Sequence, residues 1–119
     1  QPALAPEIPF GLASRYEGAA GSNPEELIGA ALAGCFSMAL TANLGRAGFE
    51  PGSVETDASV ELVKGDGGFE ITTIALTSVA KVTEIDAAKF QEIAEETKKT
   101  CPVSKALAGP RITLDARLA

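Results

Sequence analysis

Residues 23–48 read NPEELIGAALAGCFSMALTANLGRAG, and this stretch decides the fold. Asn23 is a residue type that caps a helix N-terminus, Pro24 suits the first helical position, and Glu26 stands where a capping box places an acid. Gly48 stands just beyond a basic last turn, as at many helix C-termini. The sequence therefore predicts one long helix.

The middle of this helix, residues 27–40, carries no charge and no clear polar face. A helix that is apolar around its whole circumference is a buried helix. This run is shorter than the roughly 20 residues that a bilayer span needs, so we expect the core helix of a globular domain. Gly29, Gly34 and several alanines would allow other backbones to approach closely, and Cys35 lies near the middle.

Length and charge narrow the class of protein. A chain of 119 residues favours one domain, and a net charge of −6 argues against a nucleic-acid surface, which needs a basic patch. Residues 1–6 have neither the basic start nor the apolar segment of a signal peptide, so we expect a cytoplasmic protein. Because the chain does not begin with Met, we expect residues before Gln1.

The composition restricts the chemistry. The sequence contains no histidine, which excludes Ser-His-Asp and Cys-His catalysis and histidine-ligated metals. Its two cysteines are too few for a four-thiolate zinc site. We therefore expect chemistry by thiols, carboxylates, Arg and Lys, with no metal or cofactor.

The chain on either side of the long helix predicts strands. Residues 12–17 fit a short strand before a glycine-rich turn. Apolar and polar side chains alternate over residues 54–62, and the turn at 65–68 leads into a second strand from Phe69 to about Val82. The sequence predicts a hairpin, with a bulge where the alternation changes phase at Thr72-Thr73-Ile74.

The C-terminal part predicts two helices and a strand. Apolar residues follow helical spacing from Thr83 or Asp86 to about Thr100. A short helix is expected over 101–107, and alternation over 112–118 predicts a closing strand. The order of elements indicates an α+β domain whose central helix is covered by sheet.

The cysteines leave two interpretations open. Cys35 could be a buried core residue, because cysteine is among the most buried residue types. Cys101 precedes Pro102, a favourable first helical residue, and a thiol at a helix N-terminus has a lowered pKa. Spacing alone does not show whether the two meet. Taken alone, Arg15 in a strand and Glu25 in a first helical turn are typical of solvated or helix-stabilising charges.

Several motifs carry a family resemblance. Residues 23–31 (NPEELIGAA), 33–40 (AGCFSMAL) and 101–107 (CPVSKAL) closely resemble the osmotically inducible protein C family, OsmC, with its organic hydroperoxide resistance relatives, Ohr. Residues 11–18 (GLASRYEG) and 112–115 (ITLD) resemble the OsmC branch.

The resemblance covers essentially the whole chain. It implies an OsmC-like α+β fold in which a long buried central helix and a second helix pack with antiparallel sheets, in an intertwined homodimer. Residues 1–119 would form a single OsmC-like domain, and the family's first strands would precede residue 1.

The resemblance also implies site residues. Cys35 takes the position of the peroxidatic cysteine and Cys101 that of the resolving cysteine. Glu25 matches the family's glutamate, and Arg15 is the best match to the arginine of the OsmC branch. Arg15 would lower the pKa of Cys35 and bind the peroxide, while Glu25 would hold the guanidinium.

The implied activity is a thiol peroxidase of oxidative and osmotic stress defence. Organic hydroperoxides, with fatty-acid hydroperoxides among the candidate substrates, would be reduced to alcohols through a sulfenic acid on Cys35 and then a Cys35–Cys101 disulfide. An external dithiol, of the lipoyl type or from another thiol system, would reduce the disulfide. The expected apolar walls of the site are Leu32, Phe36, Met38 and Leu40.

Two other functions compete with this hypothesis. The first is a domain that binds or carries a small apolar ligand, with both cysteines in the core. The second is a disulfide oxidoreductase acting on protein thiols, which the absence of a Cys-X-X-Cys motif disfavours.

Overall fold

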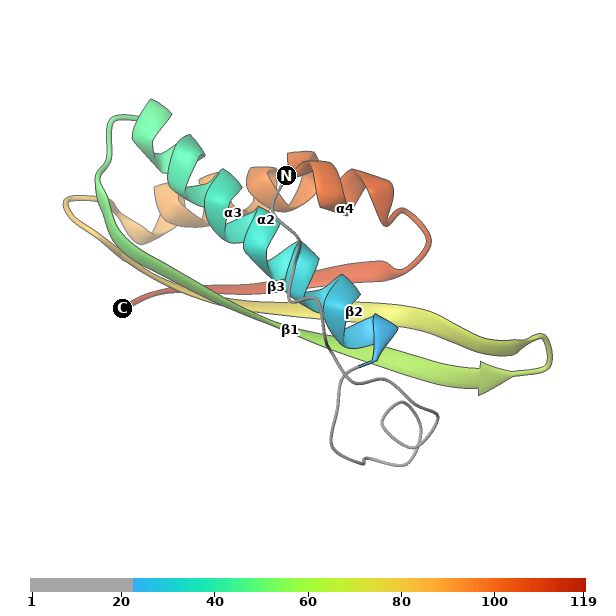
Figure 1. Ribbon diagram of the computed structural model, residues 1–119. Coiled ribbons are helices and arrows are strands. Elements are labelled where there is room, and N and C mark those ends of the chain that lie inside the picture. Colours follow the sequence, from blue (N-terminus) through green and yellow to red (C-terminus); the bar gives the residue numbers. More distant parts are fainter. Residues whose placement is uncertain (1–22) are drawn as a thin grey trace, which may run out of the picture.

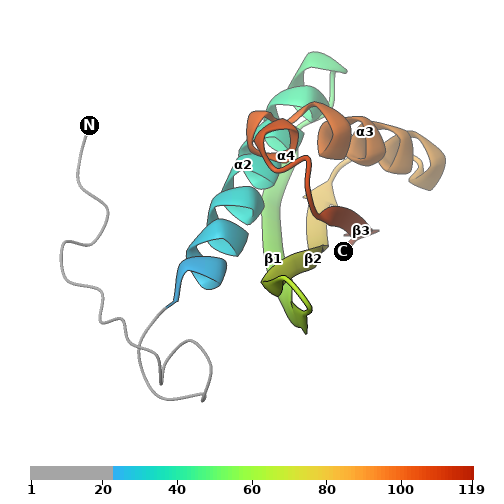
Figure 2. The same cartoon turned by 90° about the vertical axis from the view of Figure 1, so that its right-hand side faces the viewer.

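A layer of helices lies on one face of a three-stranded sheet in residues 23–119, the part of the chain that this computed structural model describes (Figures 1 and 2). The predicted α+β class is confirmed. The strand predicted over residues 12–17 lies outside the described residues. In chain order the elements are α2 (Pro24–Arg46), β1 (Pro51–Gly65), β2 (Gly68–Val82), α3 (Ala87–Thr100), α4 (Pro102–Ala106) and β3 (Arg111–Leu118).

Helix α2 begins and ends where the sequence predicts. The Asn23 side chain accepts a hydrogen bond of 2.8 Å from the backbone N–H of Glu26, and Pro24 is the first helical residue. The chain leaves the helix after Arg46, and Gly48 has a φ of 92°, a conformation that glycine adopts without strain. Local capping signals therefore set both ends of the helix.

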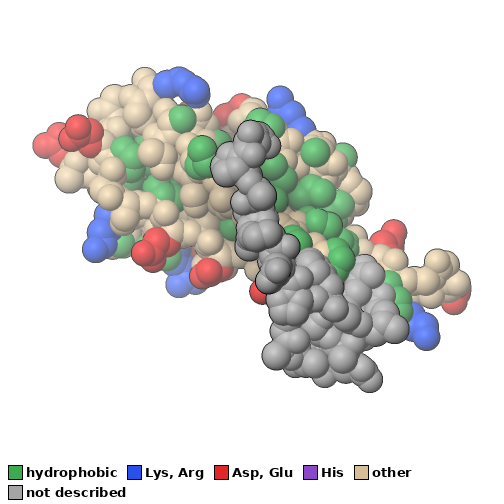
Figure 3. All heavy atoms as spheres, in the orientation of Figure 1, with side chains coloured by type: hydrophobic (Ala, Val, Ile, Leu, Met, Phe, Trp, Pro, Cys, Tyr) green, Lys and Arg blue, Asp and Glu red, His purple; other side chains and the backbone are tan. Residues whose placement is uncertain are grey.

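Only one face of α2 is buried within the single chain. Its Leu32, Phe36 and Leu40 side chains are fully buried over the sheet. On the outward face Met38 is 77% exposed, and Gly34 is exposed as well. Figure 3 shows hydrophobic side chains gathered on the face that carries α2, with charged side chains mostly toward its edges. The expectation of all-round burial is thus wrong for this chain by itself.

Helix α2 is also longer than its central apolar run suggested. With 23 residues and a mean hydropathy of 1.7 in its most apolar window, it is long and apolar enough to cross a membrane. The expectation that it is too short for a span is therefore wrong. Its packing against the sheet, rather than its length, identifies it as the core helix of a globular domain.

Strands β1 and β2 form the predicted antiparallel hairpin, including its bulge. Glu61 pairs with Thr73 while Leu62 pairs with Ile71, so Thr72 is the additional residue on β2. The Thr72 hydroxyl donates a hydrogen bond of 2.8 Å to the Glu61 carboxylate. The phase change in the sequence therefore located the bulge correctly.

Strand β3 corrects the expectation of purely antiparallel sheets. The strand order is β1-β2-β3, and β3 runs parallel to β2. The chain leaves the end of β2, passes through α3 and α4 along the helical layer, and returns to start β3 beside the middle of β2 (Figure 1). A helical crossover of this kind joins parallel strands.

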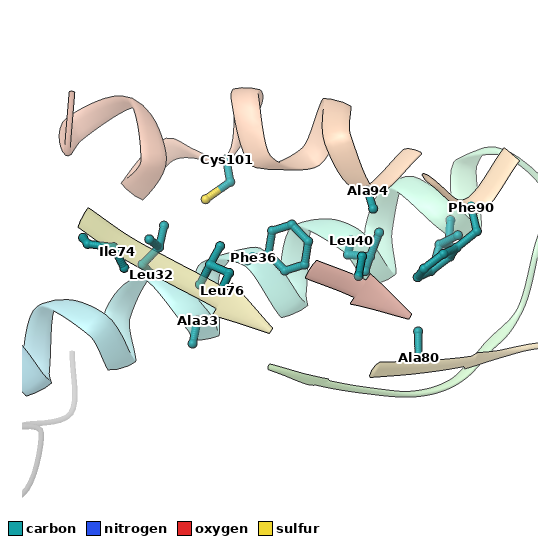
Figure 4. Packing of buried hydrophobic residues seen from close by; sticks show 12 residues of the cluster. Leu32, Ala33, Phe36, Leu40, Ile74, Leu76, Ala80, Phe90, Ala94 and Cys101 are labelled. Carbon is teal, nitrogen blue, oxygen red and sulfur yellow. The ribbon is translucent and has the colours of Figure 1, made fainter. Parts of the chain in front are cut away.

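Helices α3 and α4 meet at Cys101, which is the C-cap of α3 and the N-cap of α4. Asp86 caps the N-terminus of α3, and its side chain accepts a hydrogen bond of 2.8 Å from the backbone N–H of Lys89. Phe90 and Ala94 point from α3 into the core formed with α2 and the sheet (Figure 4). The same packing places Cys101 over the middle of α2.

Candidate active site

The sulfur atoms of Cys35 and Cys101 lie 3.0 Å apart, although 66 positions separate the residues in sequence. Cys35 comes from the middle of α2, and Cys101 from the junction of α3 and α4. Both are free thiols. In Figure 4 the Cys101 sulfur points toward α2 and the core. At this separation a disulfide needs only a small movement of the side chains.

The two thiols differ in access. Cys35 is half-buried, whereas Cys101 is 1% exposed. The Ser104 hydroxyl lies 3.3 Å from the Cys101 sulfur, and Ser104 is itself buried, with 8% exposure. One sulfur can therefore meet a molecule from solvent, while the other is enclosed beside a hydroxyl group.

The titrations of the two thiols are coupled. Burial is the largest influence on both sulfurs and raises the pKa of each. The contact with Cys101 adds to burial and holds the pKa of Cys35 above its ordinary value. For Cys101, contacts with Cys35, with the Ser104 hydroxyl and with backbone N–H groups outweigh burial and bring the pKa below its ordinary value.

Ionisation of either sulfur therefore affects the pKa of the other. The reduced geometry has the Cys101 thiol donating to the Cys35 sulfur, whereas the pKa directions favour charge on Cys101. The heavy atoms do not fix the position of a thiol hydrogen, and the lowered pKa of Cys101 favours negative charge on that sulfur. A cation beside Cys35 would move the charge to Cys35.

Glu25 is a buried carboxylate in the first turn of α2, with 7% exposure. The positive end of the helix stabilises a negative charge there, and a buried carboxylate also favours a cationic partner. Ten residues of helix separate it from Cys35, or about 15 Å along the axis. The structure thus does not bring these two residues together within one chain, and Arg15 lies outside the described residues.

The expected apolar walls are mostly core residues. Leu32, Phe36 and Leu40 are fully buried and pack beneath α2, so they do not line an open site. Met38 points outward instead. The expectation failed because a helix that is apolar all round gives no signal of which face packs on its own sheet.

Ser104 is a neighbour of the thiols that the sequence interpretation missed. Cys101 caps α4, and Ser104 is its third residue. A cap side chain and the side chain three residues later lie close together, as in a capping box. The spacing C-P-V-S therefore contained the signal. In residues 23–119 no group of three or more His, Cys, Asp or Glu side chains is placed to hold a metal ion.

Comparison with known proteins identifies the family. Residues 17–115 match the family described as OsmC-like protein. The chain belongs to this family. It is 54% identical over 110 residues to the peroxiredoxin OsmC of Escherichia coli (strain K12), a match that covers 92% of this chain and 76% of that protein.

Relatives of the Ohr type are more distant. The organic hydroperoxide resistance protein OhrB of Bacillus subtilis (strain 168) is 37% identical over 98 residues, covering 81% of this chain and 69% of that protein. The crystal structure of B. subtilis OhrB superposes with a TM-score of 0.65 at 33% identity, covering 90% of this chain and 76% of that one. The resemblance to the OsmC and Ohr proteins is confirmed.

Proposed function

We propose that this protein is a cysteine-based peroxidase that reduces organic hydroperoxides to alcohols in antioxidant defence. One observation supports this most directly: a half-buried thiol, Cys35, lies 3.0 Å from an enclosed thiol, Cys101. The names of its relatives, a peroxiredoxin and an organic hydroperoxide resistance protein, fit the same activity.

Cys35 is the residue that attacks the peroxide. Its thiolate attacks the terminal oxygen of R–O–OH, the O–O bond breaks, and the alkoxide takes a proton and leaves as the alcohol. Cys35 becomes a sulfenic acid. The Cys101 thiolate then attacks the Cys35 sulfur and hydroxide leaves, taking a proton to form water. The resulting disulfide prevents further oxidation.

Arg15 and Glu25 assist the first step. The Arg15 guanidinium favours the thiolate on Cys35 and donates hydrogen bonds to the peroxide. Glu25 holds the guanidinium by a paired contact. The burial of Glu25 supports this role, because a carboxylate with 7% exposure at a helix start is stabilised by a nearby cation.

An external dithiol completes the cycle. The proposed reductant is a dithiol of the lipoyl type or another cellular thiol system, which returns both cysteines to thiols. Thiol and carboxylate chemistry is sufficient, so the cycle includes no metal or prosthetic group. A supply of reduced dithiols is typical of the cytoplasm, where we place the protein.

The active form is a homodimer with sites shared between chains. The outward face of α2 is apolar and consists mostly of small residues, with Ala30, Gly34 and Met38 exposed in the single chain. Two α2 helices packed antiparallel through this face would bring Glu25 of one chain toward Cys35 of the other. This arrangement removes the separation of about 15 Å along one helix.

Peroxide consumption by the reduced protein tests the proposal. One equivalent of cumene hydroperoxide should yield one equivalent of cumyl alcohol, and added dithiothreitol should sustain turnover. Cys35→Ser should consume no peroxide. A carrier domain would bind the hydroperoxide unchanged, and a protein-disulfide oxidoreductase would reduce insulin without consuming peroxide. Either outcome contradicts the proposal.

A further inference from the structure

We propose that the external thiol attacks the Cys35 sulfur of the disulfide, and that Cys101 leaves as a thiolate which the Ser104 hydroxyl stabilises. Ser104 is then a catalytic residue of the regeneration half-reaction. This inference rests on the proposed peroxidase function and adds the direction of thiol exchange.

Access determines which sulfur the external thiol can reach. Thiol–disulfide exchange requires the attacking sulfur to approach along the S–S axis, from the side opposite the leaving sulfur. Cys101 is 1% exposed and enclosed by α2, α3 and α4, whereas Cys35 is half-buried on α2. Attack at Cys35 therefore disturbs the core least.

The surroundings of Cys101 suit a leaving group. The Ser104 hydroxyl lies 3.3 Å from its sulfur and can donate a hydrogen bond to a thiolate there. Ser104 is 8% exposed, so little water competes for this hydroxyl. The Ser104 hydroxyl and the backbone N–H groups of Ser104 and Val103 each act to lower the pKa of the Cys101 thiol. A thiol with a lower pKa leaves faster.

The exchange proceeds in two balanced steps. A thiolate of the dithiol forms a bond with the Cys35 sulfur, the Cys35–Cys101 bond breaks, and its electron pair stays on Cys101 as a thiolate. The second thiolate of the dithiol then attacks its partner sulfur in the mixed disulfide. Cys35 leaves as a thiolate, and the dithiol becomes a cyclic disulfide. Two electrons pass from the dithiol to the protein.

The location of the mixed disulfide tests the direction of attack on the unaltered protein. The disulfide form is prepared with diamide, so this test does not depend on peroxidase activity. It is mixed briefly with 2-mercaptoethanol, quenched in acid and alkylated, and the peptides are analysed by mass spectrometry. We expect 2-mercaptoethanol on Cys35 and the alkyl group on Cys101. The opposite assignment, or equal labelling of both residues, overturns the proposal.

Variants of Ser104 test the hydroxyl. Ser104→Ala should slow reduction of the preformed disulfide by dithiothreitol about tenfold, because the departing thiolate loses a hydrogen bond. Ser104→Thr keeps the hydroxyl and should recover most of the rate. Ser59→Ala removes an exposed hydroxyl on β1 and should leave the rate unchanged.

The rates of the two half-reactions, peroxide reduction and disulfide reduction, distinguish this role from a structural one. The first reaction of Cys35 with peroxide, measured before the disulfide forms, should change little in Ser104→Ala. An unchanged reduction rate in Ser104→Ala, or an equal loss in both half-reactions, would contradict the assignment. Failure of the whole protein to consume peroxide would count against the proposed function instead, since reduction of the diamide-made disulfide can still be measured.

Discussion

The Cys35 sulfur of α2 lies 3.0 Å from the Cys101 sulfur at the junction of α3 and α4, with both residues reduced. The crossover that makes β3 parallel to β2 also carries Cys101 back over the middle of α2. The arrangement of the helical layer thus creates the thiol pair, and the unequal access to its two sulfurs suits them to different tasks.

Removal of the enclosed thiol should stop the cycle after one turnover. In Cys101→Ser the sulfenic acid on Cys35 has no partner thiol, so excess peroxide should oxidise it to sulfinic acid. Mass spectrometry of the peptides around positions 35 and 101 checks this, with Cys35→Ser as the control in which the remaining thiol, Cys101, should stay unoxidised. If both variants show the same oxidation pattern, the division of roles is wrong.

Arg15→Ala should raise the pKa of Cys35, since it removes the proposed cation beside that sulfur. A thiol reacts as the thiolate above its pKa, so the peroxide reaction at neutral pH should slow and its pH profile should move upward. Thiolate absorbance is titrated against pH in the Cys101→Ser variant and in the double variant that also carries Arg15→Ala. Cys35 is the only thiol in both proteins, so the titration reports its pKa alone. An identical titration in the two proteins would exclude Arg15 from this role.

Gly29 of α2 packs closely against β1. A Cβ atom at this position would lie 2.9 Å from Cγ2 of Val60 and 3.4 Å from Cβ of Ala58. Gly29→Leu should lower the free energy of unfolding by about 1–3 kcal/mol through overpacking. Gly45→Leu is the matched control, because nothing lies within 4 Å of its Cβ position. Urea denaturation that ranks the two variants equally would contradict this packing.

The shared-site dimer predicts complementation between two impaired chains. Cys35→Ser and Glu25→Ala homodimers should each have low activity, and a mixture under subunit exchange should contain hybrids with one fully equipped site. Recovered activity should approach a quarter of the unaltered level, since about half of the dimers are then hybrids with one good site. No recovery despite proven exchange, or an active monomer by sedimentation, contradicts the shared site.

Local signals in the sequence predicted most of the fold. Helix α2 was predicted from Asn23, Pro24 and Gly48 because capping depends on neighbouring residues. The bulge at Thr72 was predicted because it changes the side-chain alternation. The parallel orientation of β3 was not predicted, because it depends on how α3 and α4 pass over the sheet rather than on any local pattern.

The site was less predictable from residue patterns than the fold. No spacing rule indicates that Cys35 and Cys101 meet, and only the family resemblance suggested their pairing. Helix α2 carries apolar residues on every side, so its sequence did not separate core residues such as Phe36 from exposed ones such as Met38. Ser104 was overlooked, although its spacing from a capping cysteine is a local signal.

The most direct test of the proposed peroxidase cycle is the fate of both thiols after one equivalent of organic hydroperoxide. Reduced protein is treated with one equivalent of cumene hydroperoxide, quenched with an alkylating reagent, digested and analysed by mass spectrometry. The proposed cycle predicts a Cys35–Cys101 disulfide within each chain and one equivalent of alcohol. Recovery of both cysteines as alkylated thiols with the peroxide intact would contradict it.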